Sequence, residues 1–276
     1  MEEQNEMSFL QHLEVLRWHL MRSVFAILLG ATSLFIAKTF VFDKIIFAPK
    51  NADFVTFRFL CEVSIKLSEW LPFIFSQDSI CIGQNLPQLQ NIHMAGQFMT
   101  HILVSLIGGI IIAFPYLVFE VWRFIKPGLK ASERKYATGI VFFTSLLFLS
   151  GVSFGYFVIT PLSVNFFLSY SISDSVATIP TLSTYISTVT TVVLACGFVF
   201  QLPNLVYFLA KAGVVSARVM KAYRKHSFVA ALILSAVITP PDVFSQILVS
   251  FPLVILYELS IFIARRVEKA AQAKLA

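Results

Sequence analysis

Long apolar segments, separated by short polar stretches, dominate the hydrophobic pattern of this 276-residue chain. A helix needs roughly 20 apolar residues to cross a bilayer core of about 30 Å. The candidate segments lie at about 23–42, 97–119, 137–160, 182–210, 228–239 and 243–264. The pattern therefore predicts an all-α integral membrane protein with six transmembrane helices.

The last two of these segments are short. Segment 228–239 has only 12 residues, and the apolar run that starts at Val243 has 15 before Glu258 interrupts it. The turn between them is Pro240-Pro241-Asp242. A re-entrant hairpin is one interpretation, but the charge count places both flanks inside and the Pro-Pro turn outside, which favours two short spans across thinned lipid.

The placement of lysine and arginine predicts the orientation, because cytoplasmic loops carry an excess of both. Sixteen of the 21 basic residues lie in the two termini and in the second and fourth loops. The exceptions surround the first outer loop and are Lys38, Lys44, Lys50, Arg58 and Lys66. Both termini are therefore expected in the cytoplasm.

These assignments make residues 1–276 a single membrane domain. We expect a cytoplasmic amphipathic N-terminus and a long periplasmic loop, followed by two cytoplasmic loops and a cytoplasmic tail. In chain order these parts are 1–22, 43–96, 126–136, 211–225 and 265–276. Residues 1–6 hold three acids and no basic residue, which argues against a cleavable signal peptide and keeps the first segment as a span.

Composition agrees with a membrane protein. Apolar residues make up 57% of the chain and charged residues 13%, about half the share usual in a soluble domain. The mean hydropathy is +0.80. The net charge of +6 would suit nucleic-acid binding if it formed a patch, but it follows the loops of one side instead. Disordered, collagen-like and nucleic-acid-binding classes are therefore excluded.

Two of the three cysteines, Cys61 and Cys81, fall in the long outer loop. If the chain lies in a bacterial inner membrane, this loop is on the oxidising side, and the pair is a candidate disulfide. Cys196 lies within the fourth span, where packing is its expected role.

The chain carries no motif for metal binding or for a phosphate-bearing cofactor. HExxH, CxxC and glycine-rich phosphate loops are absent from the sequence. His12 and His19 lie seven residues apart on one helical face, but two ligands without a third make a weak metal site. We expect no enzyme activity, no metal and no cofactor.

The informative residues are polar groups at or inside the apolar spans, because such groups are costly in lipid. We expect Glu120 to pair with Arg123 at the end of the second span. Glu258 is deeper, with Arg265 or Lys225 as its expected partner. A structural role competes with a functional one for each.

Two further polar positions lie in the later spans. Gln201 is in the middle of the fourth span, followed by Pro203, and its amide needs an interhelical partner or a ligand. Asp242 either caps the last helix or serves a functional role at the outer turn.

Two acids stand among basic residues on the predicted cytoplasmic side. Glu14 belongs to the amphipathic stretch that leads into the first span, and Glu133 lies in a Lys-Ala-Ser-Glu-Arg-Lys loop. Each is either a solvated surface carboxylate or part of a binding site.

Four segments of the chain resemble TatC, the multispanning core subunit of the twin-arginine protein translocase. They are HLEVLR (12–17), the end of the second span with its loop (114–134), FQLP (200–203) and TPPDVFSQ (239–246). The segments lie in the family's order and cover most of the chain. The last is the most specific because it is long and unusual.

The resemblance implies a receptor for signal peptides that carry two consecutive arginines, with no catalytic chemistry. It also implies assembly with single-span TatA-type subunits, and TatB-type subunits where these exist, in an oligomeric complex of a bacterial inner membrane. Folded cargo would cross this membrane, driven by the proton-motive force. The expected partners are therefore these subunits, twin-arginine signal peptides and the lipid bilayer.

By carry-over from the family, specific residues receive roles. The signal-peptide site would contain Glu133, Arg134, Phe124, Glu14 and Arg17. Carboxylates suit this task because a guanidinium pairs with them in a planar, bidentate arrangement.

The carry-over also assigns residues that contact partner subunits. Gln201 and Pro203 would form an intramembrane polar contact. Asp242, Gln246 and Pro49 would lie at the outer turn or loop.

The chain departs from the family pattern at two places. The family glutamate of the first motif falls on Val15, and the acid is one position earlier, at Glu14, which is a turn of about 100° on a helix. Gln201 stands where the family often has glutamate, and an amide cannot ionise.

A secondary transporter is the alternative function, with Glu120, Gln201 and Glu258 along its path. Transporters commonly show internal repeats, and the two halves of this sequence show no such similarity. A purely structural scaffold is a third option, but it leaves Glu133 without a role.

Overall fold

The computed structural model describes residues 9–70, 81, 87–126, 137–171, 173, 175, 179–238 and 243–272. Within these ranges the chain is helical, and the only sheet-like pairing is an isolated bridge between Gln90 and Thr181. The chain divides into two compact units, which are described separately. One comprises 1–38 and 101–147, and the other 39–100 and 148–276.

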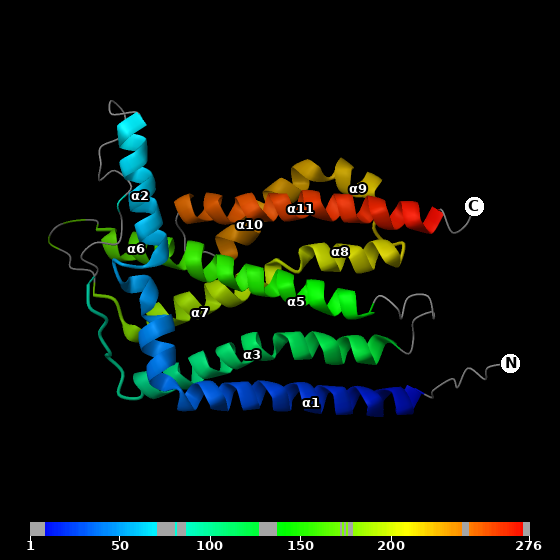
Figure 1. Cartoon of the computed structure of the whole chain (residues 1–276), viewed down its shortest axis with the longest axis horizontal. Coiled ribbons are helices and arrows are strands. Elements are labelled where there is room, and N and C mark those ends of the chain that lie inside the picture. The colour runs from blue at the N-terminus through cyan, green and yellow to red at the C-terminus, as the bar shows by residue number, and fades with distance from the viewer. Residues whose placement is uncertain are drawn as a thin grey trace. The chain divides into compact units, whose positions relative to one another are not determined.

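The first unit is built on two long antiparallel helices, α1 (Phe9–Ile36) and most of α3 (Gly96–Ile125). Figure 1 shows them side by side. Near one end His19 bonds to Glu120, and near the other the rings of Phe35 and His101 stack 3.9 Å apart. The two helices therefore stay paired along most of their length.

Between these two contacts, glycine residues allow the backbones of α1 and α3 to touch. A Cβ atom added to Gly109 would lie 2.7 Å from the backbone nitrogen of Ala31 and 2.8 Å from the carbonyl oxygen of Ile27. Gly30 faces Gly109 from α1. Small residues at a crossing are the usual basis of close helix association in membranes, where apolar burial gives little net attraction.

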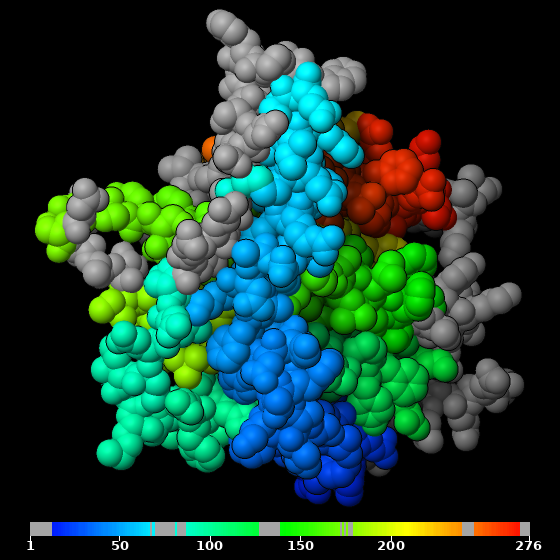
Figure 2. Space-filling model, turned by 60° about the vertical axis from the view of Figure 1, so that its left-hand side comes forward, coloured from blue at the N-terminus to red at the C-terminus, as the bar shows by residue number. Residues whose placement is uncertain are grey.

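The second unit begins with an irregular stretch that leads into α2 (Val55–Trp70). A π-helical segment (Phe40–Ile46) and a short 3-10 turn (Ala48–Lys50) precede α2. In Figure 2 this stretch and α2 run as a continuous surface from blue to cyan. The disulfide between Cys61 of α2 and Cys81 cross-links this part of the chain.

Hydroxyl groups tie this stretch to the helices behind it. Tyr156 and Tyr185 donate hydrogen bonds of 2.7 Å to the carbonyl oxygens of Ile45 and Ile46. Thr56 donates to the carbonyl oxygen of Phe157. Pro161 has no N–H to donate to that carbonyl four residues earlier, so the threonine supplies a donor where the helix lacks its usual one.

The third and fourth predicted spans are long but interrupted. The third runs through α5 (Ala137–Phe154), a π-helical segment (Gly155–Ile159) and α6 (Thr160–Ser169). The fourth consists of α7 (Leu182–Val199) and α8 (Leu202–Lys211).

Glycines again bring these two spans together. Gly151 and Gly155 lie against Cys196 of α7, and Gly197 of α7 lies against Phe148 and Val152. Cys196 is buried and unpaired, in keeping with a packing role.

The remaining helices are α9 (Ala217–Ala222), α10 (Arg224–Ile238) and α11 (Val243–Gln272). Figure 1 shows α11 beside α8. A small apolar core joins α8, α9 and α11, and it consists of Ala210, Ala217, Met220, Ile261 and Ala264.

Polar contacts flank this core. Tyr257 donates a 2.8 Å hydrogen bond to the carbonyl oxygen of Met220, and the carboxylate of Glu268 accepts one of 2.7 Å from the backbone of Ala217. Glu258 pairs at 2.6 Å with Arg224, not with the expected Arg265 or Lys225.

Five helical segments are long and apolar enough to cross a membrane, within the part of the chain that the structure describes. They start at Leu13, Gly96, Gly139, Leu182 and Gln246. The fifth predicted segment, 228–239, is not among them and corresponds to α10, whose 15 residues span about 22 Å. Apolar side chains lie open on the surface of these helices, as lipid contact requires, and the chain is a multi-pass membrane protein.

The prediction that the last helix is short is wrong. α11 has 30 residues, and 25 of them (246–270) form a membrane-capable stretch. Glu258 interrupts the apolar run in the sequence, which predicted a short helix. Its carboxylate is half-exposed and paired with Arg224, so the helix continues past this residue. Of the two final helices, only α10 is short.

Gly109→Ala should destabilise the first unit, because the new methyl group would meet the backbone of α1. We expect a loss of about 1–3 kcal/mol, the usual cost of overpacking, seen as a lower melting temperature of the purified protein in detergent. Gly139→Ala is the matched control, since nothing lies within 4 Å of its added Cβ. A melting temperature that falls equally in both variants would contradict the packing argument.

The disulfide predicts the thiol count of protein prepared without reductant. Maleimide labelling after denaturation should modify one cysteine, Cys196, and labelling after reduction should modify three. Mass spectrometry would give both counts. Three reactive thiols before reduction would show that Cys61 and Cys81 are not bonded.

Candidate functional site

Three of the residues predicted to bind a signal peptide lie in the first unit, at the end of α1 and α3 where α1 begins. Glu14 and Arg17 are exposed on α1, and the Arg17 guanidinium lies 5.9 Å from the ring of Trp18. Phe124 is half-buried on α3. Glu133 and Arg134 lie outside the described residues.

A buried ion pair lies at the same end and was not among the predicted site residues. The carboxylate of Glu120 bonds to Nδ1 of His19, and Glu120 is only 1% exposed. The imidazole also meets the ring of Phe124 edge-on, with centroids 6.0 Å apart. His19 thus connects a buried acid to an aromatic residue of the predicted site.

Other polar groups surround the Glu120 carboxylate. Tyr116, one turn earlier on α3, carries a hydroxyl group that interacts with it. Arg22 of α1 also acts on the carboxylate electrostatically, and Arg123 acts on the Tyr116 hydroxyl. Arg22 and Arg123 are exposed. A buried charge needs such compensation, because an unpaired carboxylate in an apolar interior is strongly unfavourable.

The helical phase of α1 separates Glu14 from this ion pair. At 100° per residue, Val15 is about 40° from His19 around the helix axis, and Glu14 is about 140° from it. The exposure agrees, since Val15 is half-buried and Glu14 is exposed. Val15 therefore shares the side of α1 that contacts α3, and Glu14 does not.

In the second unit, Gln201 lies at the break between α7 and α8. Its side-chain oxygen accepts a 2.7 Å hydrogen bond from the amide of Asn204. Pro203 is buried in the first turn of α8, where its missing N–H causes no loss. The break thus places a polar amide in the middle of an apolar span.

The residues predicted at the outer turn and loop also belong to this unit. Gln246 of α11 donates a 3.1 Å hydrogen bond to the carbonyl oxygen of Leu232 in α10, and Asp242 lies outside the described residues. Pro49 is buried in the 3-10 turn. Partial burial lowers the pKa of the neighbouring Lys50 below its usual range.

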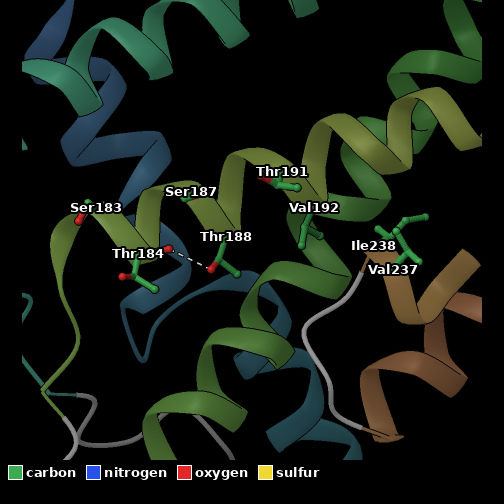
Figure 3. Close-up of a pocket in the computed structure, with 8 residues that line it drawn as sticks. All are labelled: Ser183, Thr184, Ser187, Thr188, Thr191, Val192, Val237 and Ile238. Carbon is green, nitrogen blue, oxygen red and sulfur yellow. Dashed lines mark hydrogen bonds between the residues drawn. The ribbon is translucent and has the colours of Figure 1, made fainter.

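A groove lined by hydroxyl groups runs along α7 beside the end of α10. Figure 3 shows the side chains that line it: Ser183, Thr184, Ser187, Thr188, Thr191, Val192, Val237 and Ile238. Thr184, Ser187 and Thr191 are exposed, whereas Thr188 bonds back to the carbonyl oxygen of Thr184 at 2.9 Å. These hydroxyls give an otherwise apolar helix one polar face.

The sequence predicted a helix-end pair between Glu120 and Arg123, but the structure gives Glu120 a partner on the other helix. His19 was assigned no ligand role, so the pair was missed. One signal was available in the sequence, because both residues lie at the same predicted end of neighbouring spans.

Known proteins show the same sequence pattern and fold. The chain matches the family described as Sec-independent protein translocase protein (TatC) over residues 11–252. It is 40% identical over 267 residues to TatC of Blattabacterium sp. subsp. Periplaneta americana (strain BPLAN), which covers 97% of this chain and 98% of that protein. It is 32% identical to TatC of Aquifex aeolicus (strain VF5), over 94% of this chain and 95% of that protein.

A solved structure agrees with these sequence matches. It is described as the crystal structure of a twin arginine translocase receptor, TatC. The TM-score is 0.66 at 30% sequence identity, and the match covers 93% of this chain and 99% of that one.

Proposed function

Since this chain belongs to the TatC family of Sec-independent protein translocase proteins, we propose that it is the subunit that binds twin-arginine signal peptides. As a translocase component it is not an enzyme, so its activity consists of binding and assembly. The observation that carries the proposal is the match over nearly the whole chain to a structure described as the translocase receptor.

The orientation in this proposal follows from the basic residues. Both termini lie in the cytoplasm, and the membrane is a bacterial inner membrane. α10 crosses it as the fifth and shortest of six spans. The end of α1 and α3 that carries Glu14, Phe124 and the His19–Glu120 pair then faces the cytoplasm. Precursor proteins approach from that side.

Carboxylates give this end the chemistry to bind arginine. A guanidinium offers two parallel N–H donors to one carboxylate, a geometry that lysine cannot reproduce. Glu133, in the loop after α3, is the acid that the family pattern assigns to this task. Phe124 offers an apolar and aromatic surface for the residues beside the arginines.

Polar groups in the second unit support assembly with single-span TatA-type subunits. The groove hydroxyls and the Gln201 amide lie in segments whose neighbours are apolar. Such groups gain most from a partner helix that carries its own polar side chain, because lipid offers no hydrogen bonds. A TatB-type subunit, where one exists, would bind these groups in the same way, through a polar side chain on its own helix.

The signal-peptide proposal predicts selective binding by the full-length protein in detergent. A peptide with two arginines should bind more tightly than its Lys-Lys counterpart, and Glu133→Ala should weaken the Arg-Arg peptide by about 10- to 100-fold, the range for hydrogen bonds to charged groups. Fluorescence anisotropy would measure both affinities.

An export assay in cells would accompany this measurement, with membrane insertion of the Glu133→Ala variant as the control. Equal affinity for the two peptides would refute the receptor function, and a transporter should ignore both. Full binding by Glu133→Ala would refute the role of that residue alone.

Gln201→Leu should weaken complexes with single-span partners if its amide bridges helices. We expect less of the partner to co-migrate on native gels, while the variant remains in the membrane. Asn204→Leu is the matched control, since it removes a hydrogen-bond donor to Gln201 but keeps the Gln201 amide itself. Unchanged complexes, or an equal loss in both variants, would rule out a bridging role for Gln201.

A further inference from the structure

Only two carboxylates, Glu14 and Glu120, occur in the described part of the first unit, in 9–38, 101–126 and 137–147. Glu14 is exposed and turned away from the side of α1 that contacts α3. Glu120 lies between the two helices, one turn from Phe124. It is therefore the described carboxylate that shares a surface with the aromatic residue of the binding site.

The register of α1 and α3 places this acid within the site. The helices run antiparallel, so the step of four residues from His19 to Val15 corresponds to the step from Glu120 to Phe124. Val15 is thus level with Phe124, and His19 lies one turn deeper, against both Glu120 and the ring of Phe124. A side chain that passes between Val15 and Phe124 meets His19 and then Glu120.

The His19 imidazole is a planar N–H donor, and so is a guanidinium. A buried carboxylate must keep a donor at all times, because leaving it unpaired is strongly unfavourable. Arginine satisfies this demand better than histidine, since it is always charged and donates two parallel hydrogen bonds. Exchange of one donor for the other therefore leaves Glu120 paired throughout.

Access to the carboxylate is from the histidine side. The side chain of His19 is 12% exposed, and that of Glu120 is 2% exposed. The imidazole turns away from Glu120 as the guanidinium enters, so the carboxylate keeps a donor during the exchange. Arg22 and Arg123 are exposed at this end of the helices, where ions in solution screen their repulsion of an entering cation.

We propose that Glu120 accepts one guanidinium of the twin-arginine pair, and that His19 occupies this carboxylate until the peptide replaces it. The inference rests on the proposed receptor function. His19 is then an internal substitute for the ligand, because it bonds to the same carboxylate that the guanidinium would bind.

The test uses four peptides that carry Arg-Arg, Lys-Arg, Arg-Lys or Lys-Lys at the two positions, bound to the full-length protein. In the wild type, each arginine should contribute to affinity. Glu120→Gln should weaken the Arg-Arg peptide about tenfold or more. It should also abolish the preference for arginine at one of the two positions while the other preference persists.

His19→Gln separates a ligand role from a structural one. If His19 competes with the peptide, this variant should bind the Arg-Arg peptide several-fold more tightly, because Glu120 is released. If the pair only holds α1 against α3, the variant should bind more weakly, as Glu120→Gln does. Glu69→Gln, at an exposed carboxylate of α2 outside the proposed site, is the control, and it should leave both preferences unchanged.

Retained preference at both positions in Glu120→Gln would overturn the proposal, as would weaker binding by His19→Gln. Should Glu120→Gln fail to fold in detergent, the direction of change in His19→Gln still decides. If the wild-type protein bound all four peptides equally, the receptor function itself would be refuted. The two failures are therefore distinguishable.

Discussion

The absence of water inside a bilayer is the constraint on which this structure depends, because each polar group there must find a partner within the protein. Several polar groups of the described helices meet this requirement in pairs that join different elements. The carboxylate of Glu120 is held by His19, and the Phe157 carbonyl, whose helical donor would be Pro161, accepts a hydrogen bond from the Thr56 hydroxyl. Two tyrosines hold the carbonyls of the π-helical segment. Each pair satisfies a polar group and also fixes the register of two helices.

The close packing of the helices also depends on the lipid environment. Apolar side chains gain little by leaving lipid for another helix, so association depends on close contact and on hydrogen bonds. Glycines supply that contact at the α1–α3 crossing and between α7 and the π-helical segment after α5. Conformational freedom is not the reason for glycine at these sites, since both lie in helices. The reason is the lack of a side chain.

Much of this architecture could be predicted from the sequence because hydrophobic length is a local property. The runs that became α1, α3, α7 and α11 are visible without any knowledge of packing. The predicted length of α11 was too short because a charged residue interrupts its apolar sequence. In the structure, Glu258 pairs with Arg224 and the helix continues.

The site was harder to predict than the fold, since it depends on which side chains meet across helices. A family pattern could point to Phe124 and Glu133, but nothing local in the sequence pairs His19 with Glu120, which are 101 residues apart. That contact depends on the antiparallel register of α1 and α3. The register is set at the glycine crossing and cannot be read from either helix alone.

The crossing at Gly30 and Gly109 has a mechanical consequence. A contact made by backbone atoms fixes the distance between the two helix axes at that point. Because it lies between the His19–Glu120 pair and the stacked rings of Phe35 and His101, a change in the angle between α1 and α3 would displace both of these contacts in one movement.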